Sequence, residues 1–371
     1  MKIAFSARGL SIPSGGVHQF IKSLIPALVK QRGDDELFIL YNQDKFLGLA
    51  SECSEIVIKG DNRIYWDFIQ VPKMLQELKV DAAVFPKNIV PFFLMCRSYV
   101  VVHDLAYFEK QLNAYPFLDT MYMRTLMSRS ANRADAIFAV SENTKKDIIR
   151  HTKCDPNKIT VTYEAADNMY CPINDDSVLK QVKQKYNLPD DFILYVGSLS
   201  PRKNINRLLE AFSNLRTSIP HDIVLTGSKS WKDSSVFQTM QSLNLSERIK
   251  ILGYVEHDDM PALYNLARAY VYPTLYEGFG LPVLEAMQCG CPVVASNATS
   301  IPEVAGDAAI LINPLDTKAL SDAIHQVLTD NKLREKIVAQ GFRQSKKFSW
   351  NRCAEIMLKT IRQSNAGVKV K

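Results

Sequence analysis

Short runs of β-branched and aromatic residues alternate with longer amphipathic stretches along the chain, and this alternation constrains the fold more than any other feature. The first series of predicted strands is Lys2–Ser6, Leu37–Tyr41, Glu55–Ile58, Ala82–Phe85, Tyr99–Val102, Ala136–Val140 and Ile159–Thr162. The second series is Phe192–Val196, Asp222–Thr226, Ile249–Leu252, Ala269–Val271, Pro292–Ala295 and Ala309–Ile312. Strands that alternate with helices are typical of parallel βαβ units. The sequence therefore predicts an α/β protein with two doubly wound, Rossmann-like domains.

The length of 371 residues agrees with two domains, each large enough for its own core. The predicted helices include Val17–Gln31, Ile205–Leu215, Met260–Asn265, Pro282–Cys289 and Thr317–Thr329. Between the two series, Cys171–Ser177 is polar and contains a proline, which is typical of a linker. We expect an N-terminal domain over residues 1–170 and a C-terminal domain over residues 171–350. Ligands of doubly wound folds bind at the carboxyl ends of the strands, so we expect the domains to face each other across a cleft and share one site.

Composition excludes several classes of protein. Hydrophobic residues make up 47% of the chain and charged residues 23%, as in folded rather than disordered proteins. No apolar run approaches the roughly 18 residues that span a bilayer, and the N-terminus becomes polar at Ser6. We therefore expect a cytoplasmic protein without a signal peptide. The seven cysteines are scattered without a Cys-x-x-Cys pair, which predicts neither a disulfide framework nor a zinc site.

The net charge of +6 is concentrated near the end of the sequence, since residues 331–371 hold 11 Lys or Arg against 2 Asp or Glu. Apolar residues such as Trp350, Leu358 and Ile361 lie among these basic residues. A second mixed stretch contains Tyr115, Phe117, Met121, Tyr122, Met123, Arg124 and Arg129. Both stretches favour the hypothesis of peripheral, electrostatic contact with the inner face of an anionic membrane. The alternative is a solvated basic helix and a stretch that packs inside its domain. No nucleic-acid module surrounds the basic block, so nucleic acid is not an expected partner.

Two features of the first half could bind a ligand. Gly15 and Gly16 follow the first strand and open the first helix, where bare backbone and helix dipole favour a phosphate. The alternative is a tight turn, because the spacing of a dinucleotide site is missing. His103 follows the strand Tyr99–Val102, at the sheet edge where ligands bind, although such a histidine is more often a structural, hydrogen-bonded residue.

A basic pair follows the first strand of the second half. The segment Phe192–Asn204 runs from a hydrophobic strand through Gly197 and Ser198 to Arg202 and Lys203, just ahead of a helix. A guanidinium and an ammonium group there could neutralise a diphosphate without a metal ion. The alternative is a solvated basic turn.

The segment Tyr276–Met287 is the most informative, because Glu277 and Glu285 flank the glycine-containing loop Gly278-Phe279-Gly280-Leu281. Pro282 suits the first turn of a helix, and the loop is expected to leave backbone amides exposed beside that helix N-terminus. The two carboxylates could accept hydrogen bonds from hydroxyl groups at two points of one elongated ligand. The alternative makes Glu285 a first-turn acid that complements the helix dipole and Glu277 a solvated loop residue.

Together these motifs resemble the retaining glycosyltransferases of the GT-B fold, specifically the large family 4 of nucleotide-sugar-dependent enzymes. The resemblance covers nearly the whole chain in order, and its most specific element is the Glu-x7-Glu pattern of Glu277 and Glu285. It implies a last helix, within residues 351–371, that crosses back to the first domain. The catalytic residues implied are His103 near the donor sugar, Arg202 and Lys203 on the diphosphate, and Glu277 on sugar hydroxyls. The donor-binding residues implied are Gly15, Gly16, Ser198, Gly278, Phe279, Gly280, Leu281 and, at the ribose, Glu285.

The expected reaction is the transfer of a hexose from a nucleotide-diphosphate sugar to a saccharide or lipid-linked saccharide acceptor in cell-surface polysaccharide synthesis. The resemblance implies retention of configuration, and no Asp-x-Asp motif lies in a suitable loop, so we expect no metal ion and no other cofactor. GDP-mannose is the favoured donor, because the Gly-Gly loop with His103-Asp104-Leu105 resembles bacterial polysaccharide mannosyltransferases. A UDP-sugar is the alternative donor. A nucleotide-sugar epimerase, a phosphorylase and a non-catalytic binding protein are alternative functions, against which the Glu-x7-Glu pattern and the basic pair weigh.

Overall fold

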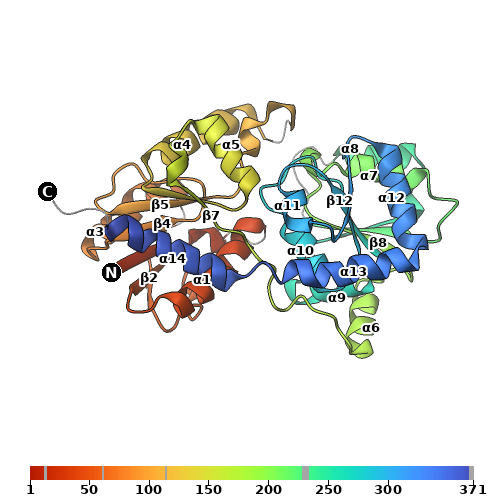
Figure 1. The fold of residues 1–371 in the computed structure, drawn as a ribbon, viewed down its shortest axis with the longest axis horizontal. Helices are drawn as coiled ribbons and strands as arrows, with labels where there is room; N and C mark the ends of the chain where they lie inside the picture. Colours follow the sequence, from red (N-terminus) through yellow and green to blue (C-terminus); the bar gives the residue numbers. More distant parts are fainter. Residues whose placement is uncertain (12–14, 61, 113–114, 228–233, 367–371) are drawn as a thin grey trace. The chain divides into compact units, whose positions relative to one another are not determined.

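The computed structural model describes residues 1–11, 15–60, 62–112, 115–227 and 234–366, and it divides the chain into two compact units (Figure 1). Unit 1 consists of Met1–Phe108, Phe117–Glu164 and Ser349–Lys371. Unit 2 consists of Glu109–Pro116 and Ala165–Phe348. The first boundary therefore falls at residue 164 rather than 170, and the second at residue 348 rather than 350.

The prediction that Cys171–Ser177 links the two domains is wrong, because this segment belongs to unit 2. The amide group of Asn265 holds it in place, with 3.0 Å from Nδ2 to the carbonyl oxygen of Cys171 and 2.9 Å from Oδ1 to the nitrogen of Ile173. Asp175 then caps helix α6 (Asp176–Lys185) by accepting a hydrogen bond from the Ser177 nitrogen at 2.8 Å. The polar residues of Cys171–Ser177 thus include the cap of α6, and the segment is not a flexible linker between the units.

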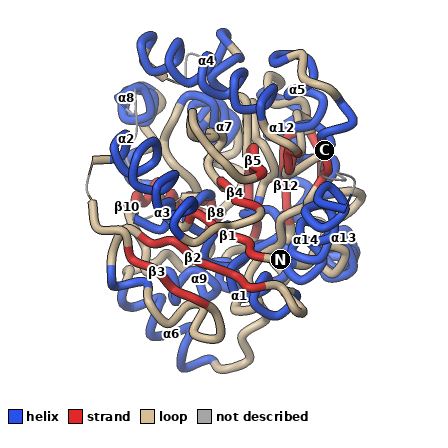
Figure 2. Tube along the Cα trace, turned by 90° about the vertical axis from the view of Figure 1, so that its left-hand side faces the viewer, coloured by secondary structure: helices blue, strands red, loops and turns tan. Residues whose placement is uncertain are grey.

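Unit 1 contains a sheet of seven parallel strands in the order β3-β2-β1-β4-β5-β6-β7 (Figure 2). The strands are β1 (Lys2–Ser6), β2 (Glu36–Tyr41), β3 (Ser54–Val57), β4 (Ala82–Phe85), β5 (Arg97–Val102), β6 (Ala136–Ala139) and β7 (Ile159–Val161). Its α-helices are α1 (Gly16–Gln31), α2 (Arg63–Tyr65), α3 (Val71–Glu77), α4 (Phe117–Arg133), α5 (Glu142–Thr152) and α14 (Trp350–Ala366). The strand order reverses between β1 and β4, so the carboxyl ends of these two strands form the topological switch point where ligands of such sheets bind.

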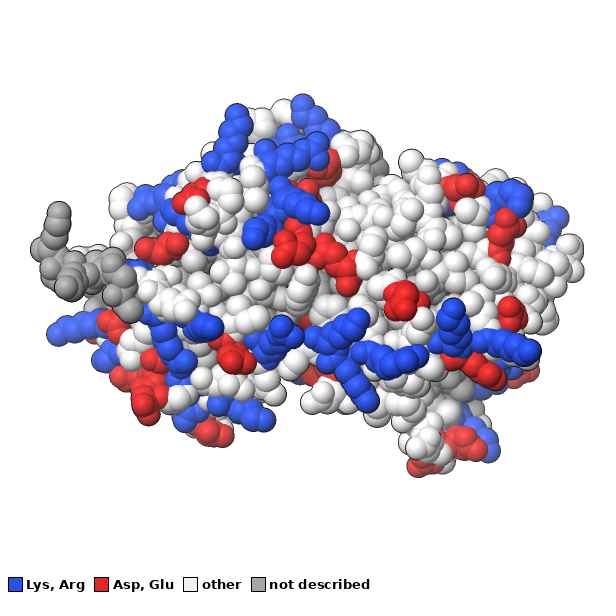
Figure 3. All heavy atoms as spheres, viewed as in Figure 1, with Lys and Arg blue, Asp and Glu red and all other residues white. Residues whose placement is uncertain are grey.

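The terminal helix α14 packs on α1, the first helix of unit 1. Its apolar face is buried, with Cys353, Met357, Leu358 and Ile361 all about 1% exposed or less. Its basic residues remain at the surface, and Figure 3 shows Lys and Arg side chains over α14. This confirms a last helix that returns to the first domain. It contradicts the part of the membrane hypothesis in which apolar residues of this helix contact lipid, because those side chains form the contact with α1.

Unit 2 contains a sheet of six parallel strands in the order β10-β9-β8-β11-β12-β13. The strands are β8 (Phe192–Val196), β9 (Asp222–Thr226), β10 (Ile249–Gly253), β11 (Ala269–Tyr272), β12 (Val293–Ser296) and β13 (Ile310–Ile312). Besides α6, its α-helices are α7 (Ile205–Ser213), α8 (Ser234–Ser242), α9 (Met260–Leu266), α10 (Leu281–Gln288), α11 (Ile301–Ala305), α12 (Thr317–Thr329) and α13 (Asn331–Ser345). Here the strand order reverses between β8 and β11, which places the switch point of unit 2 at the carboxyl ends of those strands.

The predicted fold class is confirmed, and every predicted strand is present with ends that differ by two residues at most. Central strands such as β5 and β8 are buried on both faces, and they show in the sequence as continuous apolar runs for that reason. None of the described helices is long and apolar enough to cross a bilayer.

Candidate functional site

The basic pair lies at the switch point of unit 2. After β8 the backbone turns at Gly197, whose φ of 146° favours glycine, and a short 3-10 turn (Pro201–Lys203) then carries both cations. The loop that follows β11 fixes this turn, since the Leu275 nitrogen donates to the Arg202 carbonyl oxygen at 2.8 Å. Asn204 adds two bonds from its Nδ2, to the carbonyl oxygens of Pro273 and Pro314. The turn is therefore rigidly held at the sheet edge.

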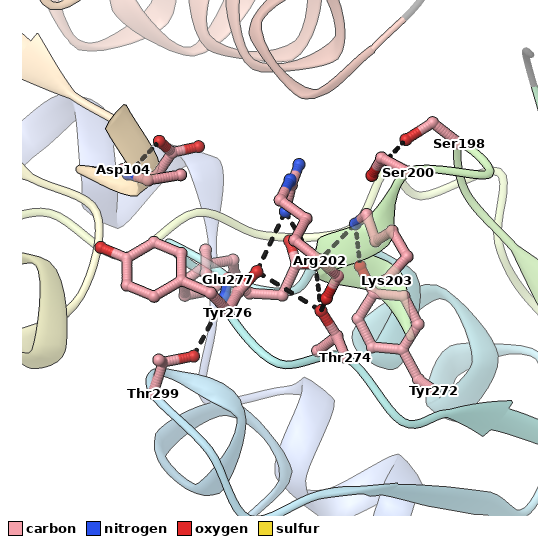
Figure 4. Close-up of polar contacts among 12 residues, drawn as sticks. Asp104, Ser198, Ser200, Arg202, Lys203, Tyr272, Thr274, Tyr276, Glu277 and Thr299 are labelled. Atoms are coloured by element: carbon pink, nitrogen blue, oxygen red, sulfur yellow. Dashed lines mark hydrogen bonds and ion pairs between the residues drawn. The ribbon is translucent and has the colours of Figure 1, made fainter. Parts of the chain in front are cut away.

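Arg202 and Lys203 share one partner, the carboxylate of Glu277 (Figure 4). Glu277 Oε1 lies 3.0 Å from Arg202 NH1 and 2.6 Å from Lys203 Nζ, and it also accepts a bond of 2.8 Å from Thr274. The side chains of Lys203 and Glu277 are only 9% and 10% exposed. The alternatives of a solvated basic turn and a solvated loop acid are therefore wrong.

The Glu277 carboxylate is ionised and leaves the cluster with one net positive charge. Burial alone would raise the pKa of Glu277, but the charges of Arg202 and Lys203 together outweigh it and lower the pKa to about 2. One carboxylate against two cations gives a net charge of about +1 at neutral pH. Among the described residues, the hydrogen bonds to this carboxylate go to Oε1, which leaves Oε2 for a ligand hydroxyl group. The cluster can therefore hold an anion and a hydroxyl group together.

Glu285 lies in a different environment from Glu277. It is the fifth residue of α10, and the hydroxyl group of Tyr264 donates to its Oε2 at 2.8 Å. Burial raises the pKa of Glu285 to about 7, although hydrogen bonds from Tyr264 and Tyr170 act in the opposite direction. The alternative of a first-turn acid is wrong, because the first turn of α10 contains no acidic residue. A carboxyl group that is half-ionised near neutral pH can change its charge when a ligand binds.

The loop between the two acids is packed rather than exposed. All residues from Gly278 to Leu281 are buried, which corrects the expectation of exposed amides. The ring of Phe279 is 4% exposed and meets the ring of Phe348 edge-on at 5.7 Å, so this side chain fills the core of unit 2, and the role of Phe279 in donor binding stays a prediction. The hydroxyl group of Ser300 fixes the loop by donating to the carbonyl oxygens of Glu277 and Phe279, at 3.0 and 2.7 Å.

The glycine loop of unit 1 is only partly described, because Ser14 lies outside the described residues. Gly15 caps α1 with a φ of 117°, a conformation that side chains other than glycine rarely adopt. Gly16 is the first residue of α1, and both glycines are exposed with open space around the Cα. The geometry agrees with close approach of a ligand to bare backbone. The role of Gly15 and Gly16 stays a prediction.

His103 is partly buried in unit 1, with its side chain 12% exposed and both ring nitrogens bonded. Nδ1 lies 3.2 Å from the carboxylate of Glu164, and Nε2 lies 2.9 Å from the carbonyl oxygen of Pro86. Burial opposes the charged form, but Glu164 and the Pro86 carbonyl group outweigh it and raise the pKa of His103. Two acceptors therefore hold the imidazole in place and favour its charged form. A bond from its ring to a donor sugar requires an exchange of partner at Nε2, and this role stays a prediction.

The mixed stretch around α4 divides into exposed and buried residues. Phe117, Leu118, Met121 and Tyr122 are 45–78% exposed, whereas Met123 is 8% exposed and packs in the core. The two arginines of the stretch are engaged within unit 1: Arg124 bonds the Tyr107 carbonyl oxygen at 2.6 Å, and the Arg129 guanidinium lies 4.0 Å from the ring centroid of Phe92. The exposed side chains at the start of α4 are therefore mainly apolar, with the acidic Asp119 among them.

Comparison with known proteins decides the family. Residues 14–168 match the family described as Glycosyltransferase Family 4, and residues 179–344 match Glycosyl transferases group 1. The chain is 39% identical to the O-antigen chain mannosyltransferase B of Escherichia coli, over 95% of this chain and 97% of that protein. The chain belongs to glycosyltransferase family 4.

Other relatives and solved structures agree with this glycosyltransferase assignment. The serotype-specific mannosyltransferase WbdA of Escherichia coli is 33% identical over 76% of this chain and 36% of its own length. Sucrose-phosphate synthase from Thermosynechococcus elongatus superposes with a TM-score of 0.79 at 19% identity, covering 99% and 100% of the two chains. WaaG, a glycosyltransferase of lipopolysaccharide biosynthesis, gives a TM-score of 0.75 at 17% identity, over 97% and 99%. These structures share the GT-B fold of the chain.

Several residues at the candidate site of this glycosyltransferase were missed by sequence reasoning. Glu164 pairs with His103, Thr274 and Ser300 brace Glu277, and Tyr264 bonds Glu285. Gly227 was also missed: a Cβ there would come within 2.1 Å of the Gly197 carbonyl oxygen. The sequence could have indicated Gly227, because this glycine directly follows the predicted strand Asp222–Thr226. Ser198 lies beside the close approach of Gly227 and Gly197. Among the described residues, the one partner of its hydroxyl group is the hydroxyl group of Ser200. That these residues and those of unit 1 meet in one cleft stays a prediction.

Proposed function

We propose that this glycosyltransferase transfers mannose from GDP-mannose to a saccharide or lipid-linked saccharide acceptor, with retention of configuration and without a metal ion. The choice of mannose rests on the 39% identity to a mannosyltransferase of O-antigen synthesis over nearly the whole chain. A UDP-sugar is the alternative donor.

The observation that supports the chemistry is the buried cluster of Arg202, Lys203 and Glu277 at the switch point of unit 2. When the bond between sugar and diphosphate breaks, negative charge grows on the leaving oxygen. A fixed guanidinium and ammonium group stabilise that charge with little reorganisation, and they supply the charge that a divalent cation provides in metal-dependent enzymes. Glu277 holds both cations in place, and its Oε2 can accept a hydrogen bond from a sugar hydroxyl group.

The retaining outcome is part of this proposal and rests on the resemblance to the retaining enzymes of the family. In this proposal the leaving diphosphate accepts the proton of the acceptor hydroxyl group on the face from which it departs. Glu277 is held by two cations and is a poor nucleophile, because its pKa is lowered to about 2. In this proposal the protein contributes position and electrostatic stabilisation rather than a covalent intermediate.

The experiment that tests this proposal supplies the purified protein with GDP-mannose or UDP-glucose and an acceptor glycoside. Mass spectrometry identifies the product, and proton NMR gives the anomeric configuration of the new bond. Transfer of mannose with an α linkage from the α-configured donor is the expected result. Transfer only from UDP-glucose, or a β product, would refute the donor or the retention respectively.

We also propose that the exposed start of α4 contacts a membrane surface peripherally. Phe117 and Leu118 are 75% and 78% exposed, and burying such side chains at a lipid interface is favourable. The test is co-sedimentation with vesicles of phosphatidylglycerol and phosphatidylcholine, for the wild type and for the double variant Phe117→Ser and Leu118→Ser. The matched control is Leu315→Ser, at a residue of unit 2 that is 64% exposed. A wild-type protein that stays in the supernatant overturns the proposal.

A further inference from the structure

Unit 1 contains a pocket at its own switch point, where the carboxyl ends of β1 and β4 lie side by side. Its empty space, which includes open solvent at the mouth, is about 480 Å³. Residues that follow β1 and β4 form one wall, and α2 with the π-helical turn Trp66–Gln70 forms the other. The wall residues used below are Arg8, Arg63, Trp66, Asp67, Pro86 and Lys87.

Positive charge exceeds negative charge in this pocket. Asp67 Oδ2 lies 4.0 Å from Arg8 NH1 and 3.6 Å from Arg63 Nε, so one carboxylate serves two guanidinium groups. Among the residues that the structure describes, the ammonium group of Lys87 has neither a hydrogen bond nor an ion pair. The pocket-lining residues therefore hold three cations against one anion.

Two observations indicate that these cations are short of partners. The Nε of Arg8 is buried without a hydrogen-bond partner among the described residues, although a buried donor normally has one. Burial, together with the charges of Arg63 and Arg8, lowers the pKa of Lys87 to about 8. An anion placed between Arg8, Arg63 and Lys87 would relieve both conditions, because it would accept hydrogen bonds and offset the repulsion.

The packing around Arg8 holds one of these cations in position before any anion binds. The Arg8 guanidinium lies 5.9 Å from the ring centroid of Trp66, and Trp66 is itself fully buried with its indole nitrogen bonded to the Ile58 carbonyl oxygen at 2.6 Å. This packing fixes the position of one cation. Pro86, which lines the pocket, also accepts the bond from His103 Nε2, so the pocket adjoins the candidate catalytic histidine.

We propose that this pocket binds a phosphate or diphosphate group of the acceptor, through Arg8, Arg63 and Lys87. The inference rests on the proposed glycosyl transfer and deepens it, because it makes the preferred acceptor an anionic, phosphate-bearing saccharide rather than a neutral glycan. The diphosphate of a lipid-linked saccharide and the phosphate of a phosphorylated free saccharide share this chemistry, and the acceptors used in the test separate them. The donor diphosphate remains assigned to Arg202 and Lys203 of unit 2.

The first experiment measures acetylation of Lys87 by an N-hydroxysuccinimide ester with mass spectrometry of the intact enzyme's peptides. Inorganic pyrophosphate is the probe, mannose is the neutral control, and the exposed Lys73 of α3 is the internal reference. Pyrophosphate is expected to slow acetylation of Lys87 several-fold relative to Lys73, and mannose is not. Equal acetylation with and without pyrophosphate overturns the proposal. Protection by GDP at a far lower concentration than by pyrophosphate also overturns it, since the pocket would then recognise the nucleotide of the donor.

The second experiment compares three acceptors that carry the same sugar: a diphosphate lipid, a sugar phosphate and a neutral octyl glycoside. For Lys87→Gln, kcat/KM for a phosphate-bearing acceptor is expected to fall about tenfold or more relative to the neutral one, as for the loss of a charge-assisted bond. Lys87→Arg should restore the ratio of kcat/KM between the phosphate-bearing and the neutral acceptor, and Lys73→Gln should leave this ratio unchanged. A ratio that stays constant in Lys87→Gln refutes the anion subsite. Transfer to the neutral acceptor by the wild type tests the proposed function separately, so the two failures are distinguishable.

Discussion

The pH dependence of nucleotide binding follows from the buried carboxyl group of Glu285. Its pKa is raised to about 7 by burial, and the proposed role of its ionised form is to accept hydrogen bonds from the ribose hydroxyl groups. Because the pKa is raised, the carboxyl group is mostly protonated at pH 6 and mostly ionised at pH 8. Binding of GDP should therefore strengthen as the pH rises through this range.

The magnitude follows from the ionised fraction. With a pKa of about 7, roughly one molecule in eleven is ionised at pH 6 and about ten in eleven at pH 8. If only the ionised form binds ribose fully, the dissociation constant of GDP falls about tenfold between these pH values, or about 1.4 kcal/mol. Isothermal titration calorimetry at pH 6, 7 and 8, at constant ionic strength, measures this change.

The variant Glu285→Gln isolates the contribution of this carboxyl group. The GDP phosphate itself titrates near pH 6, so part of the pH dependence belongs to the ligand and should persist in the variant. The remaining tenfold change should disappear, and the affinity at pH 8 should be lower than that of the wild type. Glu256→Gln, at an exposed residue of the same unit, is the matched control. The reasoning is refuted if Glu285→Gln keeps the full pH dependence of the wild type.

Three further predictions concern the basic cluster. The double variant Arg202→Ala and Lys203→Ala should lose at least about 100-fold in kcat, because two charges that stabilise the leaving group are gone, and unchanged turnover would contradict that role. Glu277→Gln should lose sugar transfer. It should bind free GDP at least as tightly as the wild type, because the negative charge that neutralises part of the charge of Arg202 and Lys203 is removed. Weaker GDP binding would show that Glu277 has another role. The free energy of unfolding of Glu277→Gln at pH 7 should be about 3 kcal/mol lower than that of the wild type. Because the pKa of Glu277 is lowered in the folded protein, the wild type loses this advantage as the pH falls from 4.5 towards 2. Denaturant titrations of both proteins across this pH range measure the difference. Transfer should persist in EDTA, and loss that magnesium or manganese reverses would exclude metal independence.

The sequence predicted the strands well because their signal is local. A run such as Phe192–Val196 is buried on both faces of a parallel sheet, and this burial requires a continuous apolar pattern. The helix Thr317–Thr329 was likewise predicted with its observed bounds, and in the structure Asp316 caps it by accepting a hydrogen bond from the Ala319 nitrogen.

The partners of the site residues could not be predicted in the same way. Arg202 and Lys203 were identified as a basic pair, but their shared bond to Glu277 joins positions 74 and 75 residues apart, which no local pattern encodes. The bond between His103 and Glu164 spans 61 residues for the same reason. Phe279 was assigned to the donor as part of the glycine-containing loop, and the packing of its ring on Phe348, 69 residues away in sequence, could not be predicted.

The position of α14 has a consequence for how the chain is made. Arg362 of this helix pairs with Asp35 across 327 residues of sequence, and the apolar face of α14 covers α1. At about 5–20 residues per second, a ribosome needs roughly 16–65 s to synthesise that interval. During this time the side of α1 on which α14 packs lacks the cover that this helix provides in the complete unit. Although residues 1–164 are made early, unit 1 is therefore complete only when the end of the chain has been made, and we expect a product that ends before Trp350 to leave α1 uncovered and unit 1 less stable.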